Sequence, residues 1–361
     1  MTALLVIAIL VLLIVVHEFG HFLAAKIFRV KVQEFGIGFP PRALTFGRWG
    51  ETEYTLNWIP FGGFVRLFGE EEGSQHGKGS FIDSPRWKQA IILVAGVTMN
   101  MLIAWVLFAT AYTMGILHTV EADVVPPGGK LIVTDIVLGS PADAAGIKQG
   151  DEMLSLSDES GEVAQLSPAG IMDFVRERGG EELVVEFAHQ GATSSAIVRP
   201  AHAVISEEAG RPAIGIGLAI VTSASLPLSE AIQAAGVSTY NVLVLSLDGL
   251  WEIIKSALRG NPDLQNVTGP IGIVGAVGEA SENGWGYVLM LAGFISVNLA
   301  IINLIPIPAL DGGRLAVVGA EAIMRRDVPK LVMQILNALG IALIIMLMLT
   351  VTYQDIMRLL S

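Results

Sequence analysis

Residues 3–28 read ALLVIAILVLLIVVHEFGHFLAAKIF, in which an unbroken apolar run is followed directly by a histidine, a glutamate and a second histidine. About 20 apolar residues in a helix are enough to cross the hydrocarbon core of a bilayer. The stretch therefore predicts a membrane helix over residues 1–28. A cleaved signal peptide begins with basic residues, and no Lys or Arg precedes this apolar run, so we expect the helix to be retained.

Three further apolar stretches of this length lie at residues 91–117, 287–313 and 331–353, so the sequence predicts a multi-span α-helical membrane protein. Of the 361 residues, 52% are apolar and 16% are charged, and the mean hydropathy is +0.61. This composition excludes a disordered chain. The formal net charge of −12 argues against a nucleic-acid-binding protein, which needs clustered Lys and Arg. The absence of Cys excludes disulfides and thiolate metal ligands.

The distribution of basic residues predicts how the four helices are oriented. Eight Lys and Arg residues lie in the loop 29–90 and four lie in the link 314–330, so both should be cytoplasmic. Residues 118–286 should then lie on the opposite side. Within them, residues 231–247 are uncharged but rich in polar side chains. We interpret them as part of a linker, 203–286, that includes an amphipathic helix on the outer membrane surface.

The first predicted helix carries the pattern His-Glu-x-x-His, formed by His17, Glu18 and His21. Residues four apart lie on the same face of a helix, so both imidazoles can bind one metal ion while the glutamate acts as a general base. Ionisable groups inside a membrane helix are energetically expensive and are usually functional. The alternative interpretation is a helix end at which the three side chains simply meet water.

Two histidines do not complete a catalytic zinc site, which has three protein ligands and one open position. The other buried acidic candidate is Asp311, within the predicted helix 287–313. Pro306 and Pro308 remove two backbone donors there, and the glycines at 312–313 free the backbone, so the helix should be broken. Non-helical backbone at membrane depth occurs only where it is buried in protein or lines a cavity. A broken helix that carries a carboxylate therefore indicates a buried active site.

A plain helix end with a proline stop is the alternative, but it does not explain Asn298 and Asn303 in the same helix. Topology also tests the pairing of the candidate ligands, because the two histidines lie late in the first helix and Asp311 lies late in the third. These residues can meet only if both helices run in the same direction, which requires a single helix between them. A further span at residues 231–247 would invert the third helix. The metal site therefore requires that segment to lie on the surface.

Together these motifs resemble the site-2 protease family of intramembrane zinc metalloproteases, and most closely its bacterial regulator-of-sigma-E protease branch. The matching segments follow one another over nearly the whole chain: 17–21 (HEFGH), 35–40 (FGIGFP), Gly96 with Asn100, 269–273 (GPIGI), 296–299 (SVNL) and 310–313 (LDGG). The resemblance implies that Zn²⁺ is held by His17, His21 and Asp311. It also implies that Glu18 is the catalytic residue that activates the water.

The same resemblance implies a substrate and a location. Asn298, Asn303 and Pro306 are expected to bind the substrate in the channel. The substrate would be a single-span membrane protein already trimmed by another protease, such as an anti-sigma factor or a signal-peptide remnant, cut in its transmembrane segment during regulated intramembrane proteolysis. The chain would lie in the bacterial inner (cytoplasmic) membrane as a multi-pass protein. Its partners would be that substrate and the lipid bilayer, with no nucleic acid.

Within the loop 29–90, two short strands are predicted at 53–59 and 64–68 around the turn residues 60–63. Family members carry here a re-entrant β-loop that accepts an extended substrate as an added strand. The apolar side chains of this segment favour the re-entrant loop. An ordinary cytoplasmic hairpin is the alternative.

Residues 118–202 are expected to form one α+β domain inserted between the second and third membrane helices. Residues 139–151, GSPADAAGIKQGD, resemble the PDZ domains of bacterial membrane and periplasmic proteases. Such domains bind an extended chain end. The domain would either hold the new C-terminus of the substrate or act as a size filter on the extracytoplasmic side. Many relatives carry two such domains, whereas this chain has room for one.

Two other functions remain open at this point. A membrane transporter or proton relay could use the same intramembrane His/Glu/Asp cluster, although the hydropathy pattern shows no paired inverted repeats. An inactive adaptor could bind partners through its PDZ domain, but a structural metal would not need Glu18.

Overall fold

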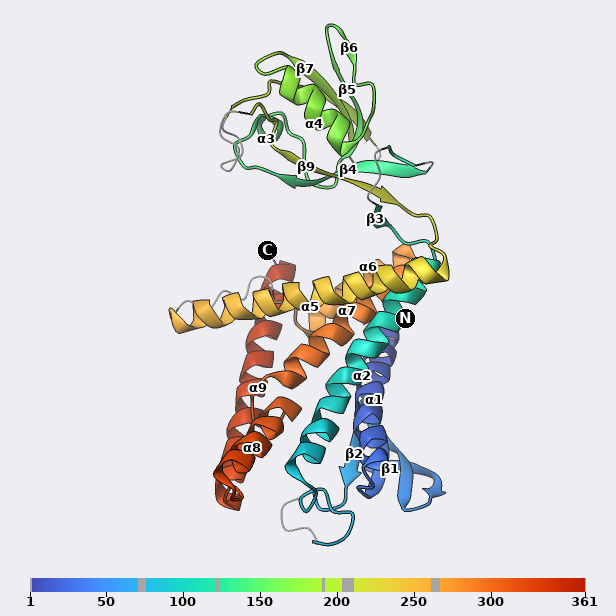
Figure 1. Ribbon diagram of the computed structural model, residues 1–361, viewed down its shortest axis with the longest axis vertical. Helices are drawn as coiled ribbons and strands as arrows, with labels where there is room; N and C mark the ends of the chain where they lie inside the picture. Colours follow the sequence, from blue (N-terminus) through green and yellow to red (C-terminus); the bar gives the residue numbers. More distant parts are fainter. Residues whose placement is uncertain are drawn as a thin grey trace. The chain divides into compact units, whose positions relative to one another are not determined.

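The computed structural model describes residues 2–70, 76–120, 124–126, 128–189, 192–202, 211–260 and 267–360. The chain forms two compact units, Met1–Met114 with Leu226–Ser361, and Gly115–Ser225. Among the described residues, four helices are long and apolar enough to cross a membrane, and all four belong to the first unit. They are α1 (Thr2–Ile27), α2 (Arg86–Thr113), α7 (Trp285–Leu304) and α9 (Lys330–Leu360), shown in Figure 1. The four predicted apolar segments are therefore confirmed as helices.

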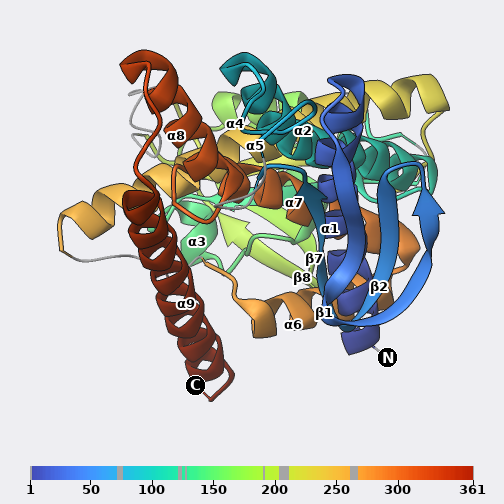
Figure 2. The ribbon, with the colours of Figure 1, turned by 90° about the horizontal axis from the view of Figure 1, so that it is seen from below.

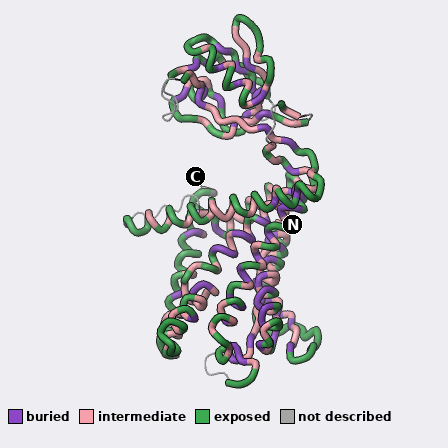
Figure 3. The backbone as a smooth tube through the Cα atoms, in the orientation of Figure 1, coloured by how far each residue is buried: buried purple, intermediate pink, exposed green. Residues whose placement is uncertain are grey.

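Small residues allow the helices of the first unit to approach closely. A methyl group added at Gly20 of α1 would lie 2.4 Å from the carbonyl oxygen of Ala95 in α2. A methyl group at Gly293 of α7 would lie 2.6 Å from the ring of Phe108 in α2. Close approach of this kind favours helix association where water does not drive it. Helix α9 differs, because only 11% of its apolar window is buried (Figure 3), which leaves its apolar surface free to face lipid.

The third apolar helix is shorter than predicted. Instead of continuing to residue 313, α7 ends at Leu304, and a new helix, α8 (Asp311–Met324), begins after a short non-helical segment. Pro306 lies in that segment. A proline has no N–H group to donate, and its ring clashes with the carbonyl group one helical turn earlier, so the helix does not continue through it. The expected cytoplasmic link 314–330 is consequently helical over most of its length.

Helices α5 (Leu228–Leu258) and α6 (Pro270–Asn283) precede α7. Figure 1 shows α5 running across one end of α2 and α7. The indole nitrogen of Trp105 in α2 donates a 2.9 Å hydrogen bond to the carbonyl oxygen of Ile232 in α5. The location of α5 on the outer membrane surface stays a prediction. Of the expected linker, residues 203–210 and 261–266 lie outside the described part of the chain.

A small antiparallel sheet between α1 and α2 is built from two long bent strands, β1 (Val32–Trp49) and β2 (Thr52–Leu67). Residues 34–37 of β1 pair with residues 53–56 of β2 on one side and with residues 63–66 on the other. Figure 2 shows both strands alongside α1.

This pairing differs from the predicted hairpin. The strands expected at 53–59 and 64–68 both exist within β2, but they flank the first half of β1 and do not pair with each other. The second half of β1, residues 42–49, pairs with the remaining edge of residues 52–57. The bend at residues 60–63 is therefore a crossover around β1, and the last part of β2 forms an edge of the sheet.

The second unit is an α+β domain with strands in the order β3-β9-β4-β5-β7-β8, while β6 pairs with β5. Its helices α3 and α4 each begin at a serine whose hydroxyl accepts a backbone N–H. In β7, alternate side chains are buried in one apolar core, as expected for a strand with one face to solvent. The elements are β3 (His118–Val120), β4 (Gly129–Ile136), α3 (Pro141–Ala144), β5 (Glu152–Asp158), β6 (Gly161–Glu162), α4 (Pro168–Glu177), β7 (Leu183–His189), β8 (Ala192–Val198) and β9 (Ile216–Thr222).

The boundary predicted for this domain, 118–202, was wrong at its C-terminal end. Strand β9 lies in the region assigned to the linker, yet it pairs with β3 on one side and with β4 on the other. The sheet would be split without it, so the domain extends to about Ser225. An apolar strand this far along the chain is identified only by its pairing, which local sequence does not show.

Candidate metal centre

The two histidines of the His-Glu-x-x-His pattern lie one turn apart on the same buried face of α1. His17 is 6% exposed and His21 is 8% exposed, and their Nε2 atoms lie 3.1 Å apart. The helix continues without a break through both residues, so their spacing follows directly from the 3.6-residue period. Both imidazoles therefore direct the same nitrogen toward one point.

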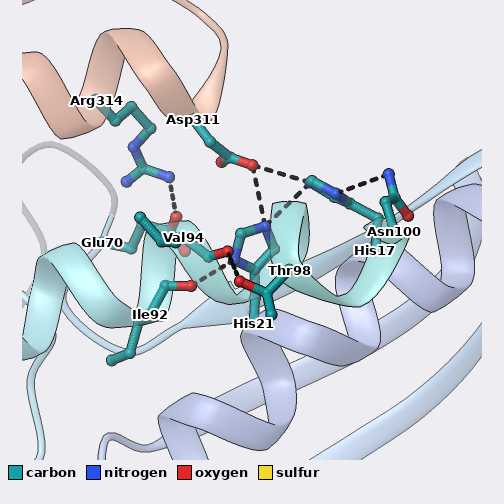
Figure 4. A network of polar contacts seen from close by, with 9 residues as sticks. All are labelled: His17, His21, Glu70, Ile92, Val94, Thr98, Asn100, Asp311 and Arg314. Carbon is teal, nitrogen blue, oxygen red and sulfur yellow. Dashed lines mark hydrogen bonds and ion pairs between the residues drawn. The ribbon is translucent and has the colours of Figure 1, made fainter. Parts of the chain in front are cut away.

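The third candidate ligand reaches this point from the other end of the chain. Asp311 is the first residue of α8, and its Oδ2 atom lies 2.9 Å from Nε2 of His17 and 3.1 Å from Nε2 of His21 (Figure 4). The three residues form the metal-competent cluster found among the described residues. If all three atoms carry lone pairs, these separations are unfavourable unless a cation or a proton lies between them. Atoms about 3 Å apart can all lie about 2 Å from one centre, the usual zinc–ligand distance, so this donor set fits zinc.

Helix α2 closes one side of the cluster, and Gly96 makes this possible. A methyl group at this position would lie 2.4 Å from Nε2 of His21 and 2.7 Å from Cε1 of His17. Any side chain larger than hydrogen would therefore displace the imidazoles. The packing of α2 on α1 leaves space for the rings only because residue 96 has no side chain.

Glu18 lies next to the cluster and contacts the last part of β2. Its carboxylate lies near the backbone N–H of Val65. A methyl group at Gly63 would lie 3.6 Å from Cγ of Glu18. The strand thus holds the carboxylate in place beside the two histidines.

The non-helical segment before α8 fixes the position of Asp311. Ala309 has a φ of +81°, which is unusual for a residue with a side chain. A methyl group at Gly312 would lie 2.2 Å from the carbonyl oxygen of Leu304, and one at Gly313 would lie 2.2 Å from that of Ile307. The first turn of α8 therefore packs directly on the end of α7, and the glycines after Asp311 are required for this contact.

Sequence reasoning missed several groups that surround the three candidate ligands. Nδ1 of His21 lies 2.7 Å from the carbonyl oxygen of Ile92, and the amide of Asn100 lies 3.3 Å from Nδ1 of His17. Metal-bound histidines usually donate their second ring N–H to a partner of this kind. In the sequence, Asn100 stands out only as part of a motif shared with the family, and that motif did not identify its partner.

A second missed contact links the loop after β2 to α8. The guanidinium of Arg314 forms an ion pair with Glu70, whose carboxylate also accepts the backbone N–H of Leu67. Arg314 lies three residues after Asp311, so this contact ties the loop after β2 to the helix that carries the third candidate ligand (Figure 4).

None of the three predicted substrate-binding residues belongs to the cluster of candidate metal ligands found among the described residues. The Nδ2 atom of Asn298 donates a 2.9 Å hydrogen bond to the carbonyl oxygen of Phe294 in its own helix. Asn303 is half-buried near the end of α7, and Pro306 is exposed in the segment between α7 and α8. Their contact with substrate stays a prediction.

The chain is similar to known proteins over nearly its whole length. The sequence profile of peptidase family M50 matches residues 5–347. A protein of Clostridium perfringens named "Putative zinc metalloprotease CPE1693" is 33% identical over 348 residues, which cover 95% of each chain. "Zinc metalloprotease RasP" of Oceanobacillus iheyensis is 26% identical over an alignment 428 residues long, which covers 96% of each chain. Among solved structures, the PDZ domain of the SdrC-like protein Lmo2051 from Listeria monocytogenes aligns with a TM-score of 0.21 and 19% identity, covering 28% of this chain and 93% of that one.

Proposed function

The chain belongs to peptidase family M50, the site-2 protease family, and we propose that it is an intramembrane zinc endopeptidase. It hydrolyses peptide bonds in the transmembrane segments of single-span membrane proteins that another protease has already trimmed, of the anti-sigma-factor or signal-peptide-remnant kind. One observation carries the proposal. His17, His21 and Asp311 converge beside Glu18 within a unit whose helices are long and apolar enough to cross a membrane.

In this proposal the two Nε2 atoms and Oδ2 of Asp311 hold the zinc ion. Bound zinc supplies a Lewis acid that activates water and polarises the scissile carbonyl group. Glu18 takes a proton from the attacking water and returns it to the leaving nitrogen. The backbone of Val65 lies near the Glu18 carboxylate and supports its position for both transfers.

The edge of β2 supports a second part of the proposal, the mode of substrate binding. Residues 63–66 pair with β1 on one side, which leaves their other edge unpaired among the described residues, and this part of the strand lies beside the Glu18 side chain. A helical substrate hides its carbonyl groups in hydrogen bonds and must unwind before attack. An unwound segment that adds to this edge as a strand lies within reach of Glu18.

We place the protein in the bacterial inner membrane, with the basic loops in the cytoplasm and residues 115–225 on the extracytoplasmic side. The positive-inside rule supports this orientation. The sequence GSPADAAGIKQGD at residues 139–151 supports assignment of the outer unit as a PDZ domain. That domain serves the protease either by holding the new end of the trimmed substrate or by excluding substrates with bulky outer domains.

The test of the proposed function is the Glu18→Gln variant of the full-length protein in detergent, with a trimmed single-span membrane protein as substrate. Cleavage should fall at least about 100-fold, because a general base is lost, while the zinc content stays at the parental level. Glu279→Gln, which changes an exposed residue of α6, serves as the matched control and should cleave normally. Undiminished cleavage by Glu18→Gln contradicts the proposal. Proton or ion flux without proteolysis would favour a transporter.

A further inference from the structure

A side-chain amide from α2 lies against the ring of His17. Asn100 is 0% exposed, and its amide lies 3.3 Å from Nδ1 of that histidine (Figure 4). The other atom of the amide, Oδ1 as placed, is buried and has no hydrogen-bond partner among the described residues. A buried polar atom without a hydrogen-bond partner lowers the stability of the folded protein. An asparagine at this position in an apolar helix is therefore expected to have a specific role.

His21 shows how the ring nitrogens of this site are used. Its Nδ1 atom lies 2.7 Å from the carbonyl oxygen of Ile92, and a carbonyl oxygen can only accept a hydrogen bond. Nδ1 of His21 therefore carries the hydrogen. In the neutral ring this leaves the lone pair on Nε2, the atom that faces Asp311.

The same requirement decides the orientation of the Asn100 amide. Nε2 of His17 also faces Asp311, so a neutral His17 that binds a metal there carries its hydrogen on Nδ1. An N–H group at Nδ1 cannot accept a hydrogen bond from the NH₂ group of the amide. The amide oxygen must face the ring instead, and a half-turn of the side-chain amide achieves this with almost no change in shape.

One further contact holds Asn100 in place. The hydroxyl of Ser296 in α7 donates a 2.8 Å hydrogen bond to the backbone carbonyl oxygen of Asn100. Gly96, one turn earlier in α2, allows both imidazoles to lie against the helix. The amide is thus presented to His17 by a rigid contact between α2 and α7.

We propose that Asn100 is a positioning residue for the metal centre, and that its Oδ1 atom accepts a hydrogen bond from Nδ1–H of His17. This bond fixes the tautomer and the ring orientation that leave Nε2 free to bind zinc. It is the counterpart of the bond between His21 and the carbonyl of Ile92. The inference rests on the proposed function, because it requires His17 to be a zinc ligand.

The test is the zinc affinity of full-length protein in detergent, measured by competition with a chelator, together with the zinc content after dialysis. Asn100→Leu removes the acceptor with little change in volume and should weaken zinc binding about 10- to 100-fold. Asn100→Asp supplies only acceptor oxygens and should stay within a few-fold of the parent. Thr98→Val is the matched control. It also removes a polar group from α2, a hydroxyl that donates to the carbonyl oxygen of Val94 in the same helix, and should leave the affinity unchanged.

Two results would overturn the inference. Parental affinity in Asn100→Leu would show that the amide does not support the ligand. An equal loss in Asn100→Asp and Asn100→Leu would show that the amide donates to His17 and does not accept from it. His21→Ala separates these outcomes from the proposed function. If that variant retains the zinc, the ligand set itself is wrong, whereas its loss of zinc beside an unchanged Asn100→Leu rejects only the role of Asn100.

Discussion

Nε2 of His17 lies 2.9 Å from Oδ2 of Asp311, although 294 residues separate the two in the chain. The first belongs to α1 and the second to the first turn of α8. The whole outer unit, Gly115–Ser225, is inserted between them. The centre therefore depends on how distant elements pack as much as on the ligands themselves, and substitutions of both kinds should affect it.

Replacing the proposed third ligand, Asp311, should remove the metal. Asp311→Asn keeps the shape of the side chain but loses its negative charge, so we expect a loss of most bound zinc, measured by elemental analysis of the purified protein. Asp327→Asn is the control, because the Asp327 carboxylate is 74% exposed and pairs with Arg86 away from the cluster. Full zinc content in both Asp311→Asn and Asp311→Ala would exclude this residue as a ligand.

A methyl group at position 96 should disturb the centre without changing any ligand. In Gly96→Ala the new methyl would lie 2.4 Å from Nε2 of His21, so the ring must move. We expect zinc affinity and cleavage to fall together, with a loss of about 1–3 kcal/mol in stability from overpacking. Gly319→Ala is the matched control, since no atom lies within 4 Å of the added group. A Gly96→Ala protein that binds zinc normally would contradict the described packing.

The buried carboxylate of Glu34 should hold the small sheet together. It accepts hydrogen bonds from Arg42 at 2.9 Å and Thr55 at 2.8 Å, and it also pairs with Arg66. Glu34→Gln removes the charge that these two guanidinium groups share, which should destabilise the sheet by about 1–3 kcal/mol. Hydrogen exchange over residues 32–67 should accelerate, and cleavage should fall because β2 contacts Glu18.

The control for this variant is Glu51→Gln in the turn between β1 and β2. Glu51 forms an exposed 2.9 Å pair with Lys31, and such pairs contribute about 0–1 kcal/mol. Equal exchange rates in the Glu34 and Glu51 variants would reject the role assigned to Glu34.

Asp355 of α9 should stabilise the start of α6. It is 4% exposed, and its two carboxylate oxygens accept the backbone N–H groups of Gly269 at 3.2 Å and Gly272 at 2.9 Å. The first N–H groups of a helix have no partner within it, and a carboxylate there is favoured by the helix dipole. Asp355→Ala should lower the stability by about 1–2 kcal/mol, seen as a lower midpoint of thermal unfolding in detergent. Asp355→Asn keeps one acceptor and should show a smaller loss; equal midpoints for all three proteins would speak against this contact.

The outer unit should lose a stabilising contact at low pH. The hydrogen bond from Nε of Arg178 holds the pKa of Asp158 below its ordinary value of 3.8. Because the pKa is lowered on folding, the contact stabilises the protein fully above that ordinary value, and the stabilisation is lost as the pH falls through the folded-state pKa. Hydrogen exchange of residues 115–225 in the full-length protein should therefore be faster in Asp158→Asn than in the parent at pH 6, and the difference should vanish at strongly acidic pH.

Asp173→Asn is the control for this pH dependence. The Asp173 carboxylate is 68% exposed and lies 3.8 Å from Arg176, a separation at which a surface pair contributes little. It should match the parent at every pH. A difference between parent and Asp158→Asn that stays constant with pH would reject the assignment.

Several features of this fold are visible in the sequence because they are local. The four apolar segments and the spacing of His17 and His21 follow from helix length and period alone. The meeting of Asp311 with these histidines follows from counting the helices between them, once residues 231–247 are kept out of the membrane. The break in the third helix follows from Pro306, although its end at Leu304 does not, because apolar residues continue past it.

The remaining features depend on partners that are distant in the chain. Strand β9 resembles a linker until it pairs with β4. The crossover of β2 around β1 could not be distinguished from a simple hairpin, because both have the same local turn residues. Asn298 and Asn100 are both asparagines in apolar helices, but one bonds within its own helix and the other contacts a histidine of α1. Only the packing of the helices distinguishes these two cases.

The division of the ligands between the two ends of the chain also has a consequence for biosynthesis. A ribosome adds about 5–20 residues per second, so roughly 15–60 seconds pass between synthesis of His21 and synthesis of Asp311. During this time the nascent chain already carries two histidines and Glu18 but has only an incomplete set of ligands. If the proposed ligands are correct, the site therefore stays incomplete until Asp311 has been translated.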